Sequence, residues 1–308
     1  MPELPEVTTI VRELNSLVRG KVIKDIETDT PKLVRPLTVA QFRAAVRGKA
    51  FLGFRRRAKF ILAALGASSR RRVPSRQSPV SSYLIWHMGM TGHPLYRNPQ
   101  AEIRNPKVAA AMRDPMNQHV RVTFHFTDGT WLEYADIRKF GKLELVRASD
   151  LSEHSQLRKL GPDAVELARR PKEFCEKLSA QRRSLKVVLM DQHVVAGIGN
   201  IYADEILWTA RLHPLLKSDR VHREQCTVLT RAVRTVLERA IRARGASIDD
   251  FRRVRGEKGR YQEIRKAYQR TGLPCSRCGT LIQRLVVGGR GTHICPRCQR
   301  ISPTKNSV

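Results

Sequence analysis

Residues 120–136 read VRVTFHFTDGTWLEYAD, and this stretch decides the fold class of the N-terminal half of the chain. From Val120 to Phe126 every second residue is apolar and the residues between them are polar, which is typical of a β-strand with one buried face. The Asp128-Gly129 pair that follows favours a tight hairpin turn. The stretch therefore predicts two antiparallel strands joined by a hairpin.

Strand-like segments also lie on both sides of this hairpin, at residues 21–29, 50–65, 82–90 and 141–146. Before them, apolar residues recur at a spacing of three and four from Val7 to Val18, which predicts a helix that ends near Gly20. We therefore expect residues 2–147 to form an antiparallel β-sandwich with this N-terminal helix packed against it.

Two stretches interrupt the strand pattern, at residues 66–82 and 97–118. Both are rich in polar and basic residues and contain prolines, a composition that is typical of surface loops. We therefore expect two loop insertions in the sandwich.

From about residue 150 the apolar periodicity becomes helical. Three segments that begin near Leu185, Ile198 and Cys226 place apolar residues on one helical face. A basic, glycine-containing loop at 252–262, RRVRGEKGRYQ, then leads into a cysteine-rich tail. The sequence predicts an α+β protein with a helical domain over residues 148–262 and a small C-terminal module over residues 263–300.

Four cysteines near the C-terminus form two C-x-x-C pairs, CSRC and CPRC, separated by sixteen residues. Four thiolates on two such tight turns suit tetrahedral zinc, and a closed set of four protein ligands marks a structural site. A redox pair would instead place one C-x-x-C before a helix. We therefore expect one structural Zn²⁺ bound by Cys275, Cys278, Cys295 and Cys298.

The charge of the chain indicates a polyanionic partner. Its 58 Lys and Arg residues against 28 Asp and Glu residues give a formal net charge of +30, so nucleic acid is the first candidate. We find no long apolar run or lipidation signal that favours a membrane, and no signal-peptide pattern at the start. We therefore expect a cytoplasmic protein in which Cys175 and Cys226 are buried free thiols.

Two further segments have the residue types of a phosphate contact. Gly197, Gly199 and Asn200 lie in the turn before a predicted helix, where backbone N–H groups and the amide can bind an anion, or where Asn200 can simply cap the helix. Arg290 lies between two glycines at the tip of the hairpin between the cysteine pairs. It can contact a phosphate or remain a solvated turn residue, and these residues alone leave both alternatives open.

Taken together, these segments resemble one family, the formamidopyrimidine-DNA glycosylases, which are bacterial repair enzymes for oxidised purines. The matching motifs occur in the family's order over nearly the whole chain: PELPEV, RRAKF, HMGMTG, ADIRKFG, LGPD, GIGNIYADEILW, GRYQ, RTGLPCSRCG and GGRGTHICPRCQ. The resemblance implies damaged double-stranded DNA as the partner, a helix-two-turn-helix domain, a lesion-capping loop near 249–262 and a zinc-finger β-hairpin. We expect a monomer.

The resemblance also implies the catalytic residues. Removal of Met1 would leave the secondary amine of Pro2 as the nucleophile that displaces the damaged base, such as 8-oxoguanine or a formamidopyrimidine, and then supports β,δ-elimination through a Schiff base. An α-amine titrates near pH 8, so much of it is available as a nucleophile close to neutral pH. Glu3 would protonate the ribose ring oxygen. Lys59 and Arg290 would complete the set by contacting the phosphates.

A base inside a duplex cannot be reached, so the enzyme must flip it out and fill the space that it leaves. By similarity, Phe140 is the apolar wedge, Met90 fills the vacated space and Arg138 faces the estranged base. On the residues alone, Met90 and Phe140 would be interpreted as core residues. The other expected DNA contacts are His119, Asn200 and Arg290.

The chain departs from the family pattern before Val120. The family usually has Lys-His-x-His there, whereas this chain reads MNQH, which keeps His119 but places Asn117 where a contact to the DNA backbone is expected. Ile137 replaces a frequent proline. The change at Asn117 puts the local phosphate affinity in question, and the change at Ile137 is milder.

Two alternatives compete with the main interpretation. The endonuclease VIII branch of the family removes oxidised pyrimidines, but Leu4 and the GRYQ loop follow the purine-specific pattern. A catalytically idle DNA-binding protein would have lost one of the catalytic residues, and the chain retains Pro2, Glu3 and Lys59.

Overall fold

The computed structural model describes residues 1–68, 79–248 and 250–301, which divide into two compact units. The first unit contains Met1–Arg158 and Ala243–Gln262, and the second contains Lys159–Arg242 and the chain from Glu263 onward. Residues 243–262 belong with the sheets and not with the helical domain, because backbone groups of this segment are hydrogen-bonded to carboxylates of the first helix. The cysteine-rich module belongs to the same compact unit as the helices.

Two antiparallel four-stranded sheets build the first unit. In order, one sheet consists of β1 (Ile23–Thr28), β6 (Val120–Phe126), β7 (Trp131–Ala135) and β5 (His93–Arg97). The other consists of β2 (Lys49–Arg57), β3 (Phe60–Ala67), β4 (Val80–His87) and β8 (Lys142–Arg147). The predicted hairpin is confirmed, because β6 and β7 are adjacent and Phe124 pairs with Leu132.

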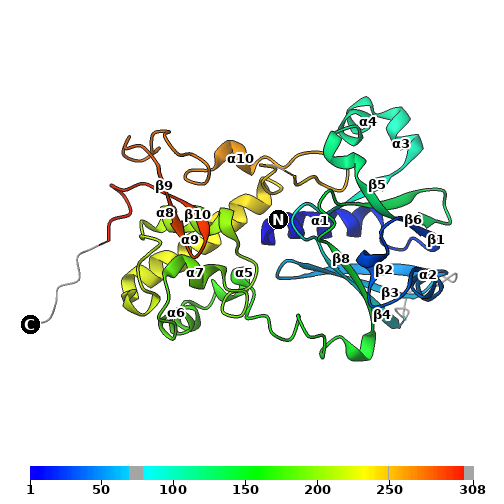
Figure 1. Cartoon of the computed structure of the whole chain (residues 1–308), viewed down its shortest axis with the longest axis horizontal. Coiled ribbons are helices and arrows are strands. Elements are labelled where there is room, and N and C mark those ends of the chain that lie inside the picture. Colours follow the sequence, from blue (N-terminus) through cyan, green and yellow to red (C-terminus); the bar gives the residue numbers. More distant parts are fainter. Residues whose placement is uncertain (69–78, 249, 302–308) are drawn as a thin grey trace, which may run out of the picture. The chain divides into compact units, whose positions relative to one another are not determined.

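The buried faces of the two sheets pack against each other, as in a β-sandwich. The ring of Trp86 on β4 stacks on that of Phe124 on β6, with centroids 5.9 Å apart. The first helix, α1 (Leu4–Leu17), packs on β2 and contributes Val7, Ile10 and Leu14 to the same core (Figure 1). Burying each of these side chains stabilises the fold by about 1.5–3 kcal/mol. The predicted α+β class and β-sandwich are therefore confirmed.

Short helices complete the first unit. They are η1 (Pro31–Val34), α2 (Val39–Val46), α3 (Pro99–Arg104), α4 (Pro106–Met112), η2 (Pro115–Gln118) and η3 (Ala148–Asp150).

The expectation of a plain loop at 97–118 is wrong, because the two Asn-Pro pairs start helices. Asn98 accepts a hydrogen bond from the amide of Ala101, Asn105 accepts one from that of Lys107, and a proline takes the first helical position in each case. Of the other expected insertion, 66–82, residues 69–78 lie outside the described residues, and its two ends belong to β3 and β4.

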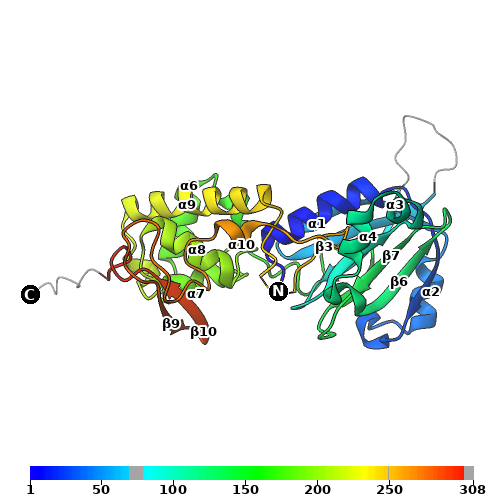
Figure 2. The same cartoon turned by 90° about the horizontal axis from the view of Figure 1, so that it is seen from above.

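The second unit is helical with one small sheet. Its elements are α5 (Ala164–Leu167), α6 (Pro171–Ser179), α7 (Leu185–Met190), α8 (Asn200–Ala210), η4 (Ser218–Arg220), α9 (Arg223–Arg242), β9 (Gln283–Val287) and β10 (Arg290–Ile294). The three helices that periodicity predicts are α7, α8 and α9. Strands β9 and β10 form an antiparallel hairpin, and β10 packs beside α8 (Figure 2). A one-turn helix, α10 (Tyr261–Ile264), lies where the chain passes between the units.

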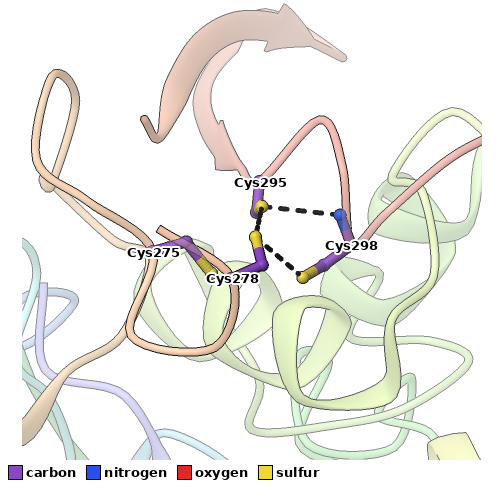
Figure 3. Close-up of side chains that lie close together, drawn as sticks. All are labelled: Cys275, Cys278, Cys295 and Cys298. Carbon is purple, nitrogen blue, oxygen red and sulfur yellow. Dashed lines mark hydrogen bonds between the residues drawn. The ribbon is translucent and has the colours of Figure 1, made fainter. Parts of the chain in front are cut away.

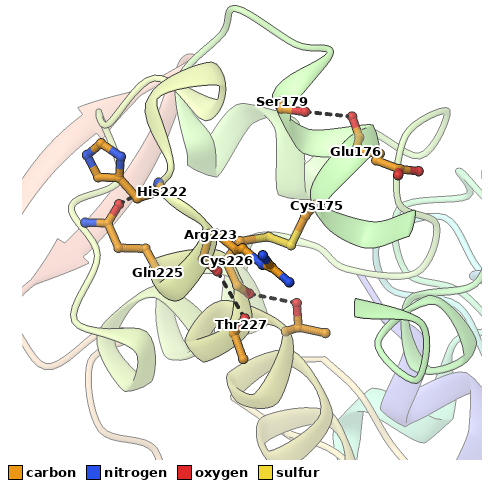
Figure 4. Close-up of a disulfide and its surroundings, with 9 residues drawn as sticks. Cys175, Glu176, Ser179, His222, Arg223, Gln225, Cys226 and Thr227 are labelled. Carbon is orange, nitrogen blue, oxygen red and sulfur yellow. Dashed lines mark hydrogen bonds between the residues drawn. A yellow bond between two sulfur atoms is a disulfide. The ribbon is translucent and has the colours of Figure 1, made fainter. Parts of the chain in front are cut away.

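Cys175 and Cys226 form a disulfide, so the expectation of two free thiols is wrong (Figure 4). Cys175 lies on α6 and Cys226 on α9, and the packing of these helices brings their Cα atoms to 5.9 Å. Helical periodicity places each cysteine on a buried face, but it does not indicate that the two faces meet.

Among the described residues, no helix is long and apolar enough to span a membrane.

Candidate functional site

The first turn of α1 is held by a buried carboxylate. Pro2 is buried, and Glu3, the N-cap residue, is only 3% exposed. Glu6 accepts a hydrogen bond from the Glu3 amide at 2.9 Å with one carboxylate oxygen and one from the Ala246 amide at 2.7 Å with the other. Gly245 has a φ of +83°, and a Cβ there would lie 2.9 Å from the Glu6 side chain. The backbone that carries Pro2 and Glu3 is therefore fixed on two sides.

Lys59 lies at the turn between β2 and β3, directly after Ala58, whose φ is 53°. The residue is only 6% exposed, so Lys59 is not the solvated cation that composition alone suggests. Strand pairing places Phe60 opposite His87, with ring centroids 4.8 Å apart. Burial lowers the pKa of the His87 imidazole, and the charge of Lys59 lowers it further. In the neutral ring, Nδ1 accepts a hydrogen bond from the Gly89 amide at 3.2 Å, which leaves the proton on Nε2.

His87 was missed at the level of sequence. It lies within the HMGMTG motif, but its relation to Lys59 depends on the register of β3 and β4. The ammonium of Lys59 and the Nε2–H group of the neutral His87 ring interact electrostatically, and both are hydrogen-bond donors. They can therefore bind the same anion.

Two loops of the first unit, 88–92 and 136–141, are joined through Asp136, which is completely buried. Its carboxylate accepts hydrogen bonds from the Thr91 hydroxyl and, at 2.8 Å, from the Gly141 amide. The Thr91 hydroxyl oxygen also accepts a hydrogen bond from the amide of Arg138 at 3.1 Å. The two loops therefore have a fixed geometry relative to each other.

The tips of these loops present apolar side chains to solvent. Met90 is 42% exposed and Phe140 is 53% exposed, so the alternative that they are core residues does not hold. The guanidinium of Arg138 lies over the Phe140 ring, 4.8 Å from its centroid. At Gly89, with a φ of +60°, a Cβ would come within 2.6 Å of the Phe140 backbone. Apolar side chains on rigid loops can insert between base pairs, which is the chemistry expected of Met90 and Phe140.

Asn117 and His119 differ in position although they are close in sequence. Asn117 is completely buried, and its amide group donates to the carbonyl of Ala111 at 2.8 Å and to that of Gly256 at 3.3 Å. It therefore holds protein segments together and does not lie where it can contact a phosphate. His119 is partly exposed, and its carbonyl accepts a hydrogen bond from the Asp136 amide at 2.9 Å, which places it beside the two loops.

In the second unit, Asn200 is the first residue of α8 and Gly199 is the N-cap, so Asn200 does not cap the helix. Its side-chain amide donates to the Gly291 carbonyl at 3.1 Å. Its side-chain oxygen is buried and has no hydrogen-bond partner in the described part of the chain. This contact joins the glycine-rich turn to the β9–β10 hairpin, next to Arg290.

Arg290 itself is exposed at the start of β10. Two glycines with positive φ, Gly288 and Gly289, make the hairpin turn before it. The structure therefore brings Asn200 and the exposed Arg290 into the same region of one unit.

A buried ion pair supports this region, and sequence reasoning missed it. Lys186 of α7 is completely buried, and its ammonium lies 2.7 Å from the Asp204 carboxylate of α8. The same ammonium donates to the Gly291 carbonyl at 3.1 Å and to the Thr292 hydroxyl at 2.8 Å. The other Asp204 oxygen accepts hydrogen bonds from the amide and ring nitrogen of His293, both at 2.9 Å. Strand β10 is thereby fixed to α7 and α8.

The four cysteines of the two C-x-x-C pairs come together as predicted (Figure 3). Their sulfur atoms lie within 4.8 Å of one another, and Cys278 Sγ is 3.4 Å from those of Cys295 and Cys298. A tetrahedral zinc with Zn–S bonds of about 2.3 Å separates its sulfurs by about 3.8 Å. The cluster therefore fits one structural zinc, which would hold the two ends of the hairpin module together.

Comparison with known proteins covers each part of the chain. Residues 1–143 match the family model of the formamidopyrimidine-DNA glycosylase N-terminal domain, residues 160–252 that of its H2TH domain, and residues 272–301 a zinc finger found in FPG and IleRS. Formamidopyrimidine-DNA glycosylase of Bacillus anthracis is 35% identical over 301 residues, which are 97% of this chain and 99% of that protein. The enzyme of the same name from Enterococcus faecalis is 35% identical and covers 98% of each chain.

Solved structures agree with the sequence comparison. A complex between Lactococcus lactis Fpg and DNA containing an abasic site has a TM-score of 0.81 at 32% identity, covering 97% of this chain and all of that one. MutM in complex with DNA containing carbocyclic 8-oxo-G has a TM-score of 0.80 at 33% identity, with the same coverage. The predicted helix-two-turn-helix domain and zinc finger are therefore confirmed.

Proposed function

This chain belongs to the formamidopyrimidine-DNA glycosylase family, and on that premise we propose that it excises oxidised purines from duplex DNA and then cleaves the abasic site. The family membership supports a DNA glycosylase that acts on damaged DNA. The observation that carries the finer proposal is the first turn of α1, where Pro2 and Glu3 are buried and held by Glu6.

The proposed reaction starts after removal of Met1. The neutral Pro2 nitrogen attacks C1′ of the damaged nucleotide, and the bond from C1′ to the base breaks, so that the base leaves with the electron pair and takes up the proton that the Pro2 nitrogen releases. Glu3 donates a proton to the ring oxygen, the sugar opens, and Pro2 and C1′ form a cationic Schiff base. The Schiff base acidifies the C2′ proton, whose loss expels the 3′ phosphate. A second elimination expels the 5′ phosphate.

The burial of Glu3 suits its proposed role. A carboxylic acid that donates a proton must be shielded from bulk water while it remains within reach of the substrate. Glu3 is only 3% exposed, and the capping box with Glu6 fixes the backbone at this position.

We propose that the duplex is opened by the two loops joined through Asp136. Phe140 enters as the wedge, Met90 occupies the space that the damaged base leaves, and Arg138 contacts the estranged base. The exposed apolar tips of these loops support this assignment.

Phosphate contacts would come from both units. In the first unit we propose Lys59, with His119 and, from the geometry, His87. In the second we propose Asn200 and Arg290, which the buried Lys186 network supports. We further propose that the protein acts as a monomer in the cytoplasm.

The experiment that tests this function compares lesions in one sequence context. Duplexes with 8-oxoguanine, a formamidopyrimidine, an oxidised pyrimidine or no lesion are incubated with the enzyme, and borohydride reduces the Schiff base to a stable adduct. We expect the fastest excision and trapping with the two purine lesions. Faster reaction with the pyrimidine would instead indicate the endonuclease VIII-like specificity, and DNA binding without any adduct would indicate an idle binding protein.

A further inference from the structure

The insertion that contains α3, α4 and η2 is tied to a distant segment of the same unit, residues 252–256. Arg252 forms a two-bond contact with Asp114 at the start of η2, with nitrogen–oxygen distances of 2.9 and 3.0 Å. A third nitrogen of the Arg252 guanidinium donates to the Phe251 carbonyl at 2.9 Å. The side chain of Arg252 is only 5% exposed, so this ion pair is largely shielded from solvent and from screening by salt.

Asn117 provides a second tie between the same two segments. It donates to the carbonyls of Ala111 and Gly256, and His93 Nε2 donates to its side-chain oxygen at 2.9 Å. At Gly256, where φ is +77°, a Cβ would lie 2.8 Å from the Asn117 amide and 3.0 Å from the Ala111 backbone. The insertion and the turn at Gly256 are therefore in direct contact, with no room for a side chain.

Two further elements of the unit hold the same turn. Glu13 of α1 forms an ion pair with Arg253 and accepts a hydrogen bond from the Val254 amide at 3.0 Å. Tyr96 of β5 donates its amide to the Val254 carbonyl at 2.8 Å. The turn is thus anchored by α1, by β5 and by the insertion.

Residues 252–256 lie within the segment near 249–262 that the family resemblance implies to be the lesion-capping loop, and this inference rests on that role and on the proposed function. We propose that the 97–118 insertion is a fixed support for the base-capping loop, and that Asp114 and Asn117 are positioning residues for recognition of the flipped base. Ordering a free loop costs conformational entropy, so a loop that is held before DNA binds loses less entropy when it closes over a base.

The contact between Asp114 and Arg252 is an ion pair near neutral pH. Burial opposes ionisation of Asp114, but hydrogen bonds from Arg252 and from the Met116 amide hold the pKa of the carboxyl below its usual value. Asp114 therefore remains a carboxylate while the enzyme works, and replacing it by asparagine removes both the charge and one acceptor.

The test compares Asp114→Asn with the matched control Glu102→Gln. Glu102 lies on α3 in the same insertion and pairs with Arg97, not with the loop. Two reactions are measured under single-turnover conditions: excision of 8-oxoguanine and cleavage at a pre-formed abasic site, which has no base to cap. We expect Asp114→Asn to slow excision by about tenfold, since the change removes the charge that holds Arg252 and one of the two oxygen acceptors in the contact. Cleavage of the abasic site should change less than twofold, and Glu102→Gln should leave both reactions unchanged.

Hydrogen exchange provides a second readout. The amides of residues 252–256 should exchange faster in Asp114→Asn than in the wild type, whereas those of β6 and β7 should not. If Asp114→Asn does not fold, Arg252→Lys keeps the charge but loses the two-bond geometry, and it should reproduce the selective loss of excision to a smaller extent. Equal loss of both reactions, or normal excision with faster exchange, would overturn the proposal. A wild-type enzyme that excises no purine lesion would instead contradict the proposed function itself.

Discussion

In the first unit the buried carboxylates of Glu6 and Asp136 accept hydrogen bonds from backbone amides and a hydroxyl, whereas in the second unit the carboxylate of Asp204 pairs with the ammonium of Lys186. Each carboxylate lies beneath exposed or reactive side chains and fixes the backbone that carries them. The two kinds of carboxylate differ in what surrounds them after a substitution removes one interaction partner. A carboxylate bound by backbone donors keeps those donors in any single variant, but Asp204 without Lys186 is a buried charge without its cation.

The largest expected effect concerns activity at the first unit. Glu3→Gln fills the same volume but cannot donate a proton, so base excision should fall by about 10²- to 10⁴-fold. DNA affinity should remain close to that of the wild type, and cleavage of a pre-formed abasic site should be retained, because the opened sugar no longer needs the acid. Single-turnover kinetics on both substrates check this. Normal excision by Glu3→Gln would remove Glu3 from the mechanism.

The next effect concerns stability of the second unit. Lys186→Met should lower the free energy of unfolding by about 3–5 kcal/mol, the usual result of breaking a buried ion pair from one side. The corresponding change in the first unit, Glu6→Gln, keeps an oxygen acceptor and should lower it by about 1–3 kcal/mol. Urea denaturation monitored by circular dichroism measures both variants. Equal losses would show that the two kinds of support do not differ as described.

The disulfide is a third difference between the units, because among the described residues only the second unit contains one. Cys175 and Cys226 are 51 residues apart, so closing this loop in the unfolded chain should contribute about 2–4 kcal/mol to stability. Reduction, or Cys226→Ser, should lower the thermal midpoint of the second unit and leave that of the first unchanged. A thermal scan with and without reductant checks this, and unchanged midpoints would show that the cross-link adds no stability.

The smallest effect concerns a single phosphate contact. Arg290→Ala should weaken DNA binding similarly for all sequences and reduce the slope of log affinity against log salt by about one. A titration at several salt concentrations measures this slope. The exposed Arg297, also on the zinc module, serves as a control, since its replacement by alanine should leave the slope nearer to that of the wild type.

The parts of this fold that sequence predicts are those that local patterns determine. The 120–136 hairpin follows from strict alternation and an Asp-Gly turn, and the zinc ligands follow from the spacing of four cysteines. Both require only neighbours along the chain. The family resemblance adds the roles of residues such as Pro2 and Glu3, whose chemistry no periodicity indicates.

The parts that sequence did not predict depend on contacts between distant segments. Nothing near Lys186 indicates that it meets Asp204, and nothing near Cys175 indicates Cys226. Asn117 reads as a departure from the family's DNA contact, and only the packing of Gly256 against it shows an internal role. The Asn-Pro pairs at the starts of α3 and α4 are an intermediate case, since the same residues are typical of loops and of helix starts.

The central claim is that the amine of Pro2, once Met1 is removed, forms the covalent bond to the sugar. The most direct measurement is peptide mapping by mass spectrometry of the adduct that borohydride traps on 8-oxoguanine DNA. The account predicts that Met1 is absent and that the mass of the reduced sugar lies on the N-terminal peptide at Pro2. An adduct on Lys59 or another lysine, or efficient trapping by protein that still carries Met1, would contradict it.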